Sequence, residues 1–286
     1  MPYAQATGAR LYYEETGDGH PIIFVHEFSA YYRHWETQVR WFSRQYRCIT
    51  FSARGYLPSE VPQNPADYGY QHSVNDIAAV LDHLNIDQAH VVGLSMGVYA
   101  TLMFGLKYGH RATSLVAAGV GSGSPPGHRA EFIKSSKAIA DRWLKDGSQA
   151  VAQSSGVSPT RIQLLNKDPR GWSEFVRMLG EHSAEGSAMT MRHYQGGRPS
   201  LEDFTAQFRS MLVPTLLVVG DEDDPCLETN LFLKRTIPMS GLWTVPKTGH
   251  AVNLEEPGLF NQVVRDFFGQ VERGRWRPRD PRAAVG

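Results

Sequence analysis

A serine stands between two glycines in the segment Gly93-Leu94-Ser95-Met96-Gly97, where one apolar run ends and another begins. At a sharp strand-to-helix turn, side chains two residues before and after the serine would collide with the neighbouring strand and helix, and glycine removes that clash. A serine hydroxyl becomes an effective nucleophile only when a base takes its proton. The spacing therefore makes Ser95 a candidate nucleophile and requires a base elsewhere in the chain.

The candidate base is His250, on a glycine-flanked loop that follows the last predicted strand. A single histidine is more often a surface or core residue, but this position lets the ring reach back over the strand ends. A base of this kind needs a carboxylate that fixes its tautomer and stabilises the imidazolium. Asp221, Glu222, Asp223 and Asp224 follow the preceding strand. Because four buried charges in one loop would be costly, we choose Asp223, with Asp224 as the alternative.

The elements that must position these residues alternate between strand and helix, which predicts an α/β fold: a mostly parallel central sheet with helices on both faces. Short apolar β-branched runs predict buried strands, and apolar residues at helical spacing predict the helices between them. Ser73 is the expected N-cap of one helix. The expected strand segments are 10–16, 21–26, 47–52, 89–95, 114–121, 214–224 and 241–246, and the expected helices are 35–45, 73–86, 96–109, 226–236 and 256–272.

The alternation breaks at about residue 122, in the run GSGSPPGH. Residues 123–205 show helical patterns divided by Gly, Pro and Ser and no strand of the buried type, which favours an inserted helical cap, or lid. Residues 1–122 and 206–272 are then the α/β core. The basic, proline-rich tail 273–286 is expected to be disordered.

Composition narrows the class of protein. Lys and Arg together number 29, as do Asp and Glu, so net charge gives no reason to expect nucleic acid or an anionic membrane as partner. Cys48 and Cys226 are the two cysteines, expected to be reduced thiols. The N-terminal segment lacks an apolar stretch of signal-peptide length, so a cytoplasmic enzyme with a small-molecule substrate is expected. No clustered metal-ligand spacing is seen, so neither a metal nor another cofactor is expected. The oligomeric state stays open, with a homodimer as one option.

With these motifs in place, the chain resembles the α/β-hydrolase-fold serine hydrolases, esterase-like and with a helical lid, over about residues 9–272. The resemblance is carried by the order Ser95, Asp223, His250, by the G-x-x-D pattern that ends at Asp223, and by the Gly-His pair at 249–250. The turn ARGYLPS at 53–59 is similar to the R-G-x-G-x-S loop of that family, with leucine in place of the second glycine.

Acyl transfer places negative charge on the carbonyl oxygen, and N–H donors must hold it. The Met96 amide, at a helix start, is one expected donor. The resemblance implies that the backbone N–H of Phe28 is the second, in the loop that the family usually writes H-G-x. Here the loop reads His26-Glu27-Phe28, so glutamate replaces the usual glycine.

Two interpretations of Glu27 stay open. It could contact the substrate, position water or disfavour anionic substrates, or it could point away and pair with Arg33 or Arg54. His26 is expected to be structural, bonded to the loop backbone.

Aromatic residues gather where a substrate should lie. Tyr31 and Tyr32 follow the Phe28 loop, and Tyr99 lies behind the nucleophile, so these three and Glu27 are candidate substrate contacts. The insertion adds further candidates: Trp143, Met189, Met191, His193 and Tyr194.

Three functions were weighed. The first is hydrolysis of a carboxylic ester, lactone or amide through an acyl-enzyme on Ser95, with His250 and Asp223 as base and orienting acid. The second is a C–C bond hydrolase for a ring-cleavage product or β-diketone, ranked lower because such relatives tend to have a Gly-rich oxyanion loop and an aromatic soon after the histidine. The third is a non-catalytic binder of small molecules. Serine as nucleophile argues against epoxide hydrolases and haloalkane dehalogenases, which need a carboxylate there.

Overall fold

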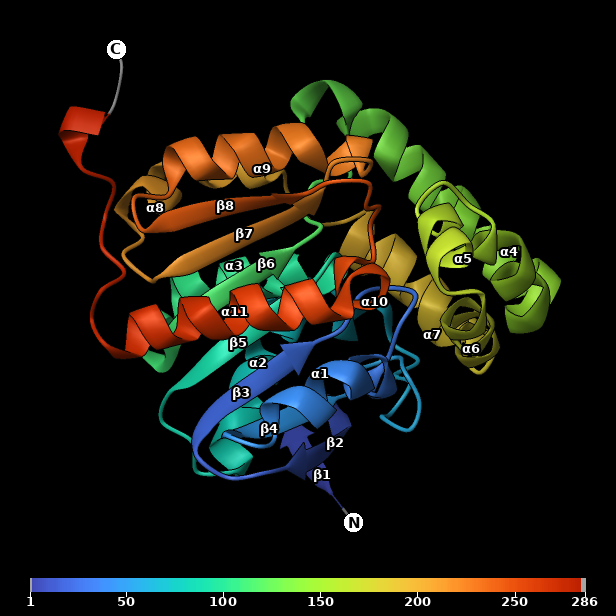
Figure 1. The fold of residues 1–286 in the computed structure, drawn as a ribbon. Coiled ribbons are helices and arrows are strands. Elements are labelled where there is room, and N and C mark those ends of the chain that lie inside the picture. Colours follow the sequence, from blue (N-terminus) through green and yellow to red (C-terminus); the bar gives the residue numbers. More distant parts are fainter. Residues whose placement is uncertain (1, 284–286) are drawn as a thin grey trace.

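A computed structural model describes residues 2–283 and shows one eight-stranded sheet with the strand order β1-β2-β4-β3-β5-β6-β7-β8 (Figure 1). β1 and β2 run antiparallel to their neighbours, and the other strands run parallel to one another. This is the mostly parallel α/β sheet that the alternating pattern predicts. The strands are β1 Tyr3–Ala6, β2 Ala9–Thr16, β3 His20–Val25, β4 Tyr46–Phe51, β5 Ala89–Leu94, β6 Ala112–Ala118, β7 Thr215–Gly220 and β8 Ser240–Val245.

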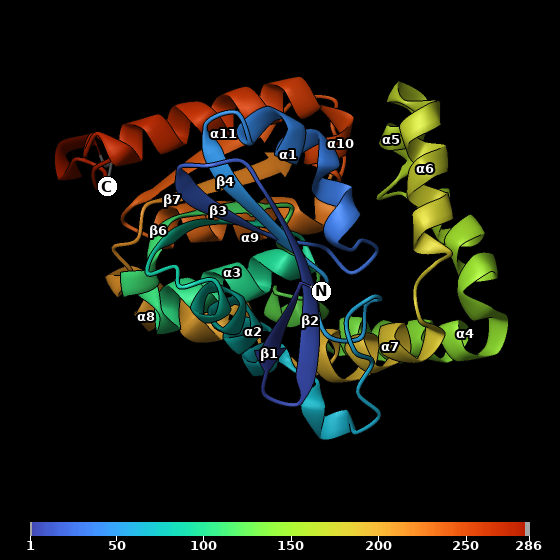
Figure 2. The same ribbon diagram turned by 90° about the horizontal axis from the view of Figure 1, so that it is seen from below.

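Helices cover both faces of the sheet (Figure 2). α1 and α11 pack on one face, where Phe42 and Phe260 belong to one buried cluster, and α2, α3 and α9 pack on the other. All six residues of β5 and of β7 are buried, because their continuous apolar runs have a helix on either side. The core helices are α1 Glu36–Phe42, α2 Tyr70–His83, α3 Met96–Lys107, α8 Thr205–Ser210, α9 Asp224–Thr236, α10 Val252–Glu255 and α11 Pro257–Glu272.

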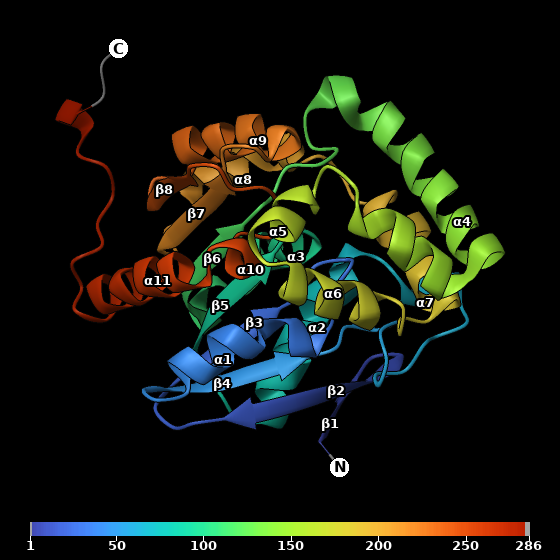
Figure 3. The ribbon, with the colours of Figure 1, turned by 45° about the vertical axis from the view of Figure 1, so that its right-hand side comes forward.

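A helical segment leaves the sheet after β6 and returns before β7, and it lies over one end of the strands (Figure 3). It has a small apolar core of its own, which includes Trp143, Phe175 and Leu179. α4 is kinked at Gly147, where a φ of 76° interrupts the helical backbone. The segment contains α4 Arg129–Gly156, α5 Ile162–Lys167, α6 Pro169–Leu179, α7 Ala184–Met189 and a π-helical turn, Thr190–Gln195.

Three local features differ from the sequence-based expectations. β1 was not predicted, because four residues are too short for a clear pattern. Ser73 is not an N-cap: α2 begins at Tyr70 after Gly69, and Ser73 lies buried in its second turn. In the tail expected to be disordered, the Trp276 ring packs on Phe267 at 4.6 Å between centroids, and its indole N–H donates to the Met239 carbonyl at 2.7 Å. An indole has enough apolar area to hold a polar segment in place. The end of that tail, 284–286, lies outside the described residues.

Candidate active site

Ser95 occupies a strained turn between β5 and α3. Its φ of 51° and ψ of −112° are costly for a residue other than glycine, and such strain is found where a structure holds a side chain in a fixed direction. The turn is possible because its flanking glycines have no Cβ: a Cβ on Gly97 would lie 2.2 Å from the Val25 carbonyl oxygen, and one on Gly93 would lie 2.5 Å from Thr101 Oγ1. The two glycines of the G-x-S-x-G motif thus remove the steric clashes that would otherwise prevent this turn.

His250 and Asp223 lie side by side, although 27 positions separate them in the chain. The Nδ1 atom of His250 and the Oδ2 atom of Asp223 are 2.7 Å apart, and the two side chains are only 6% and 2% exposed. Asp224, the alternative acid, is exposed in the first turn of α9. Glu222 is exposed too and bonds to Lys247. Of the four acids in the loop, Asp223 is therefore the one that reaches the imidazole.

Burial and the charge of the partner shift the pKa values of His250 and Asp223 in opposite directions. Burial lowers the pKa of His250, but the charge and hydrogen bond of Asp223 outweigh burial and hold the imidazole pKa well above 6.5. Burial raises the pKa of Asp223, and the attraction of His250 reverses this, so that the carboxyl pKa lies below its usual value. The pair thus favours a carboxylate that faces an imidazole of increased basicity.

The Ser95 turn and the His250 loop meet at the end of β6. The Ser95 backbone N–H donates to the Ala118 carbonyl at 2.8 Å. At the next residue, Gly119, an added Cβ would lie 3.4 Å from both Cε1 and Nδ1 of His250. The imidazole therefore packs directly on the backbone that carries the serine turn.

Cys226 is a neighbour of the pair that the sequence analysis did not place there. Its Sγ atom lies 3.9 Å from His250 Nδ1 and 3.5 Å from the Gly119 carbonyl oxygen. It is fully buried, and burial raises the pKa of its thiol, so it is a packed neutral thiol. Both cysteines are free and buried, as expected. Asp223, Cys226 and His250 offer donor atoms within 4.8 Å of one another, a spacing that a metal could use, but the Asp223–His250 hydrogen bond already engages Nδ1.

Two backbone N–H groups, one just after β3 and one just after Ser95, are the candidate oxyanion donors. Met96 is the first residue of α3, so its N–H has no acceptor within that helix. Phe28 follows β3, and within residues 2–283 its N–H donates to no backbone or side-chain acceptor. His26 supports this loop: its Nδ1 lies 2.7 Å from the Glu27 carbonyl oxygen, and its Nε2 accepts the Ala53 N–H at 2.9 Å. Burial lowers the His26 pKa to about 4, so it is a neutral, structural histidine.

Glu27 pairs with neither of the arginines named from the sequence. Arg54 instead forms a buried bidentate pair with Asp76, and Arg33 bonds to the Tyr32 hydroxyl. Glu27 is 2% exposed and forms an ion pair with Arg161, which is 4% exposed and begins α5 of the insertion. The expected partners were wrong because an ion pair between residues that are far apart in the chain cannot be predicted from the local sequence. The loop with the candidate oxyanion donor is thus tied to the insertion by a buried ion pair.

The aromatic candidates have different surroundings. The Tyr31 hydroxyl donates to Glu181 of the insertion at 3.0 Å, and the Tyr99 hydroxyl donates to the Pro199 carbonyl at 3.0 Å. Tyr32 packs edge-on against Tyr12 of β2, at 5.0 Å between centroids. Tyr31 and Tyr99 thus face the insertion, whereas Tyr32 contacts the sheet.

Two of the five insertion candidates contact the Ser95 and Phe28 segments. The Tyr194 hydroxyl donates to the Met96 carbonyl at 2.8 Å, and the Trp143 ring lies 6.0 Å from that of Phe28. Met191 is buried in the core of the insertion, and Met189 and His193 are half-buried.

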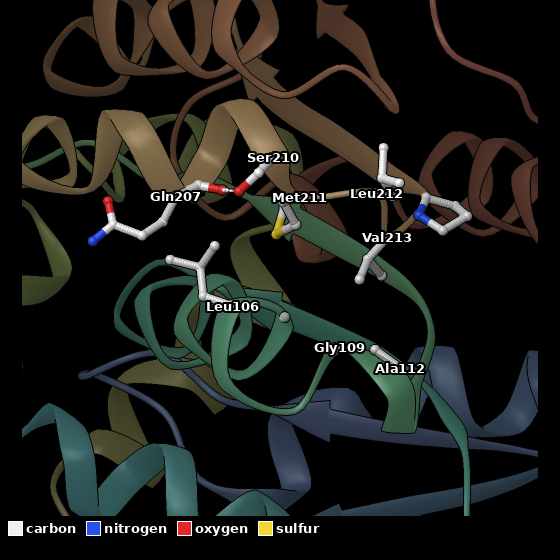
Figure 4. Close-up of a pocket in the computed structure, with 10 residues that line it drawn as sticks. Leu106, Gly109, Ala112, Gln207, Ser210, Met211, Leu212 and Val213 are labelled. Atoms are coloured by element: carbon white, nitrogen blue, oxygen red, sulfur yellow. Dashed lines mark hydrogen bonds between the residues drawn. The ribbon is translucent and has the colours of Figure 1, made fainter.

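A cleft of about 830 Å³ separates α5 and α6 from α1, and His34, Leu164, Phe175 and Leu254 are among its lining residues. Phe175 also carries the Arg161 guanidinium over its ring at 4.8 Å, so this cleft leads toward the Glu27–Arg161 pair. A second cavity, of about 500 Å³, lies between Leu106, Met211 and Val213 (Figure 4). Because β6 starts at Ala112 and β7 just after Pro214, that cavity is at the opposite end of the strands from Ser95.

Comparison with known proteins identifies the class. The model of the alpha/beta hydrolase family matches residues 22–263, so the chain belongs to that family. The predicted family and fold are thereby confirmed, as is the expectation of an α/β-fold hydrolase enzyme.

Several relatives resemble it over nearly their whole length. A Bacillus subtilis protein provisionally named 2-succinyl-6-hydroxy-2,4-cyclohexadiene-1-carboxylate synthase is 26% identical over 87% of this chain and 90% of its own. The 3-oxoadipate enol-lactonase 1 of Acinetobacter baylyi is 23% identical over 88% and 89%. Among solved structures, a thermophilic esterase of Thermogutta terrifontis with malate bound has a TM-score of 0.83 at 25% identity, covering 94% of this chain and 98% of its own.

Within the described residues, no helix is both long enough and apolar enough to cross a bilayer.

Proposed function

We propose that this protein is a serine hydrolase that cleaves a carboxylic ester or lactone, or an amide, through an acyl-enzyme. The observation that carries the proposal is the buried His250–Asp223 hydrogen bond. The His250 ring packs on Gly119, and the preceding residue, Ala118, accepts the backbone N–H of the strained Ser95 turn. A relative named as an enol-lactonase and a structural neighbour that is an esterase support the substrate class.

In this mechanism the Ser95 hydroxyl oxygen attacks the substrate carbonyl carbon as His250 takes its proton, and Asp223 stabilises the imidazolium. The amides of Phe28 and Met96 hold the negative oxygen of the tetrahedral intermediate. The intermediate collapses, the leaving alcohol takes the proton from His250, and an acyl ester remains on Ser95. Water, deprotonated by His250, then releases the carboxylic acid and restores the serine.

We further propose that residues 123–205 are a lid over this site. The support is that the Glu27–Arg161 ion pair, the Tyr31–Glu181 bond and the Tyr194–Met96 bond all join this segment to loops that follow β3 and β5. A lid with such contacts would exclude water and position the acyl group.

Replacement of the nucleophile tests the function. Ser95→Ala is expected to lower kcat toward p-nitrophenyl esters by roughly four to six orders of magnitude, because no other group can form the acyl-enzyme. Labelling with a fluorophosphonate, read by intact mass, should vanish in the same variant. Ser210→Ala, at an exposed serine of α8, is the matched control and should keep both activity and labelling. Retention of more than about a tenth of the wild-type kcat by Ser95→Ala would refute the assignment.

A C–C bond hydrolase with the same residues is the competing function. Parallel assays on p-nitrophenyl esters and a vinylogous 1,5-diketone separate the two, because an esterase should turn over the esters alone.

A further inference from the structure

Two arginines of the insertion form no ion pair among residues 2–283, although buried guanidinium groups normally have an acidic partner. Arg198 is only 5% exposed, and Arg129 is half-buried at the start of α4. Neither belongs to any ion pair among residues 2–283, unlike Arg161, which pairs with Glu27, and Arg192, which pairs with Asp141. The nearby carboxylate of Asp203 accepts the Ser200 N–H instead. A buried cation without a counter-charge is costly, so this arrangement requires an explanation.

The hydrogen bonds of the two arginines leave one donor group free on each. Arg198 donates through one NH₂ group to the Ser122 carbonyl at 2.9 Å, and Arg129 donates to the carbonyls of Gly196 and Arg198. The other NH₂ nitrogen of each guanidinium is buried and has no hydrogen-bond partner among the residues that the structure describes. Burial lowers the pKa of both guanidinium groups, and for Arg129 the attraction of the Asp203 carboxylate does not offset it.

The two guanidinium groups lie on one aromatic ring. Their Cζ atoms are 5.8 Å (Arg129) and 5.5 Å (Arg198) from the centroid of Phe132. Arg198 also lies 4.8 Å from the centroid of Tyr99, one helical turn after Ser95. We call these two side chains the Arg129–Arg198 pair. Both guanidinium groups therefore lie near the Phe132 ring, and Arg198 also contacts α3 through Tyr99.

The Arg129–Arg198 pair is joined to the segments of the candidate active site. Ser122, which accepts from Arg198, is three residues after Gly119, on which the His250 imidazole packs. The Arg198 backbone N–H donates to the Tyr194 carbonyl at 2.9 Å, and the Tyr194 hydroxyl reaches Met96. The pair therefore lies where the insertion meets the loops that carry Ser95 and His250.

We propose that the Arg129–Arg198 pair binds a carboxylate of the substrate, so that the enzyme prefers esters or lactones that carry a second, free carboxylate. One free donor group on each arginine matches the two oxygens of a single carboxylate, and charge-assisted bonds of this kind are the strong ones. Glu27 does not oppose an anion, because Arg161 neutralises it. This inference rests on the proposed hydrolase function and names its substrate class.

The kinetic test compares two acyl groups of similar length, a mono-p-nitrophenyl glutarate and a p-nitrophenyl pentanoate. The wild-type kcat/KM is expected to favour the anionic ester by at least about tenfold. In Arg198→Met the ratio of the two values should fall to about one, and Arg198→Lys should restore part of it. Arg192→Gln is the matched control: it removes one positive charge from the same insertion but should leave the ratio unchanged. No preference in the wild type, or an unchanged ratio in Arg198→Met, overturns the proposal.

A binding test separates this proposal from the catalytic one. Calorimetric titration of Ser95→Ala with succinate, glutarate and adipate is expected to show saturable binding of at least one diacid at one site per chain. Binding should be lost when Arg198→Met or Arg129→Gln is added, with circular dichroism confirming the fold. If Ser95 were not the nucleophile, this binding would persist. If none of the three diacids binds, the carboxylate site is refuted whatever the esterase assay shows.

Discussion

At the scale of single residues, the state of His250 determines how the enzyme should respond to pH. The imidazole must be neutral to accept the proton of Ser95, and the Asp223 carboxylate favours its protonated form. The pKa of His250 is held well above 6.5, so kcat/KM should rise with pH and level off only above this raised pKa. The neutral His26, by contrast, stays unprotonated through this range, because burial lowers its pKa to about 4.

Asp223→Asn tests the origin of this shift. Without the carboxylate, burial outweighs the smaller contribution of Cys226 to the His250 pKa, so the acidic limb of kcat/KM should move to lower pH. The maximal rate should also fall by roughly four orders of magnitude, because the orienting acceptor is lost. The measurement is a pH profile on a neutral ester, from about pH 5 to about pH 9. A limb that stays in place in Asp223→Asn would show that this carboxylate does not set the pKa of the base.

At the scale of elements, the Ser95 turn depends on how closely α3 approaches the end of β3. Gly97→Ala would place a methyl group 2.2 Å from the Val25 carbonyl oxygen, so the backbone would have to shift. The expected loss in the free energy of unfolding is about 1–3 kcal/mol, with reduced kcat, measured by urea denaturation and ester hydrolysis. Gly258→Ala in α11, where nothing lies within 4 Å, is the control and should be neutral or stabilising. Equal unfolding midpoints for the two variants would contradict this packing argument.

The Glu27–Arg161 ion pair joins the β3 loop to α5. Glu27→Gln would leave the Arg161 charge buried without a partner, so the unfolding free energy should fall by about 3–5 kcal/mol. The double variant Glu27→Leu/Arg161→Met removes both charges and should recover much of that loss. Urea denaturation of the single and double variants measures the coupling.

Glu36→Gln provides the control for this pair. Glu36 forms an exposed ion pair with Arg40 within α1, and its removal should change stability little. A double variant of Glu27 and Arg161 no more stable than Glu27→Gln alone would show that the pair is not what holds the loop to α5.

At the scale of the whole molecule, the segment that follows α11 packs against the start of the edge strand β8. β8 is the edge strand, and Trp276 packs on it so closely that a Cβ at Gly241 would lie 2.6 Å from the indole. The same ring contacts Phe267 of α11. This contact therefore joins the helix α11 to the start of the strand β8.

Trp276→Ala should lower the free energy of unfolding by about 2 kcal/mol, because a half-buried indole loses its apolar contacts. The change is measured as the shift in the midpoint of urea unfolding, with the denaturant slope (m-value) unchanged. Trp41→Ala, at a tryptophan that is 38% exposed on α1, should cost less. If both substitutions had the same small effect, the tail would not contribute to the stability of the sheet.

Much of the fold was predictable because its signals are local. Apolar runs such as residues 89–94 and the glycines around Ser95 depend on neighbours within a few positions, so strand, turn and helix could be placed from periodicity and sterics. The first turn of α2 was missed because it is polar and precedes the apolar pattern. The order of Ser95, Asp223 and His250 could be proposed for the same local reasons, since each follows a predicted strand.

By itself, then, the sequence determined the α/β alternation, the sharp Ser95 turn and the positions of a histidine and an acidic cluster at strand ends. Only the tertiary structure decided which acid reaches His250, that Cys226 lies beside them, that Glu27 pairs with Arg161, and that Arg129 and Arg198 form no ion pair within the described part of the chain. The physical reason is the distance along the chain over which each kind of interaction acts. Backbone preference and amphipathic spacing act over a few residues, whereas ion pairs and side-chain hydrogen bonds join residues that are up to 226 positions apart, and packing decides which partners meet.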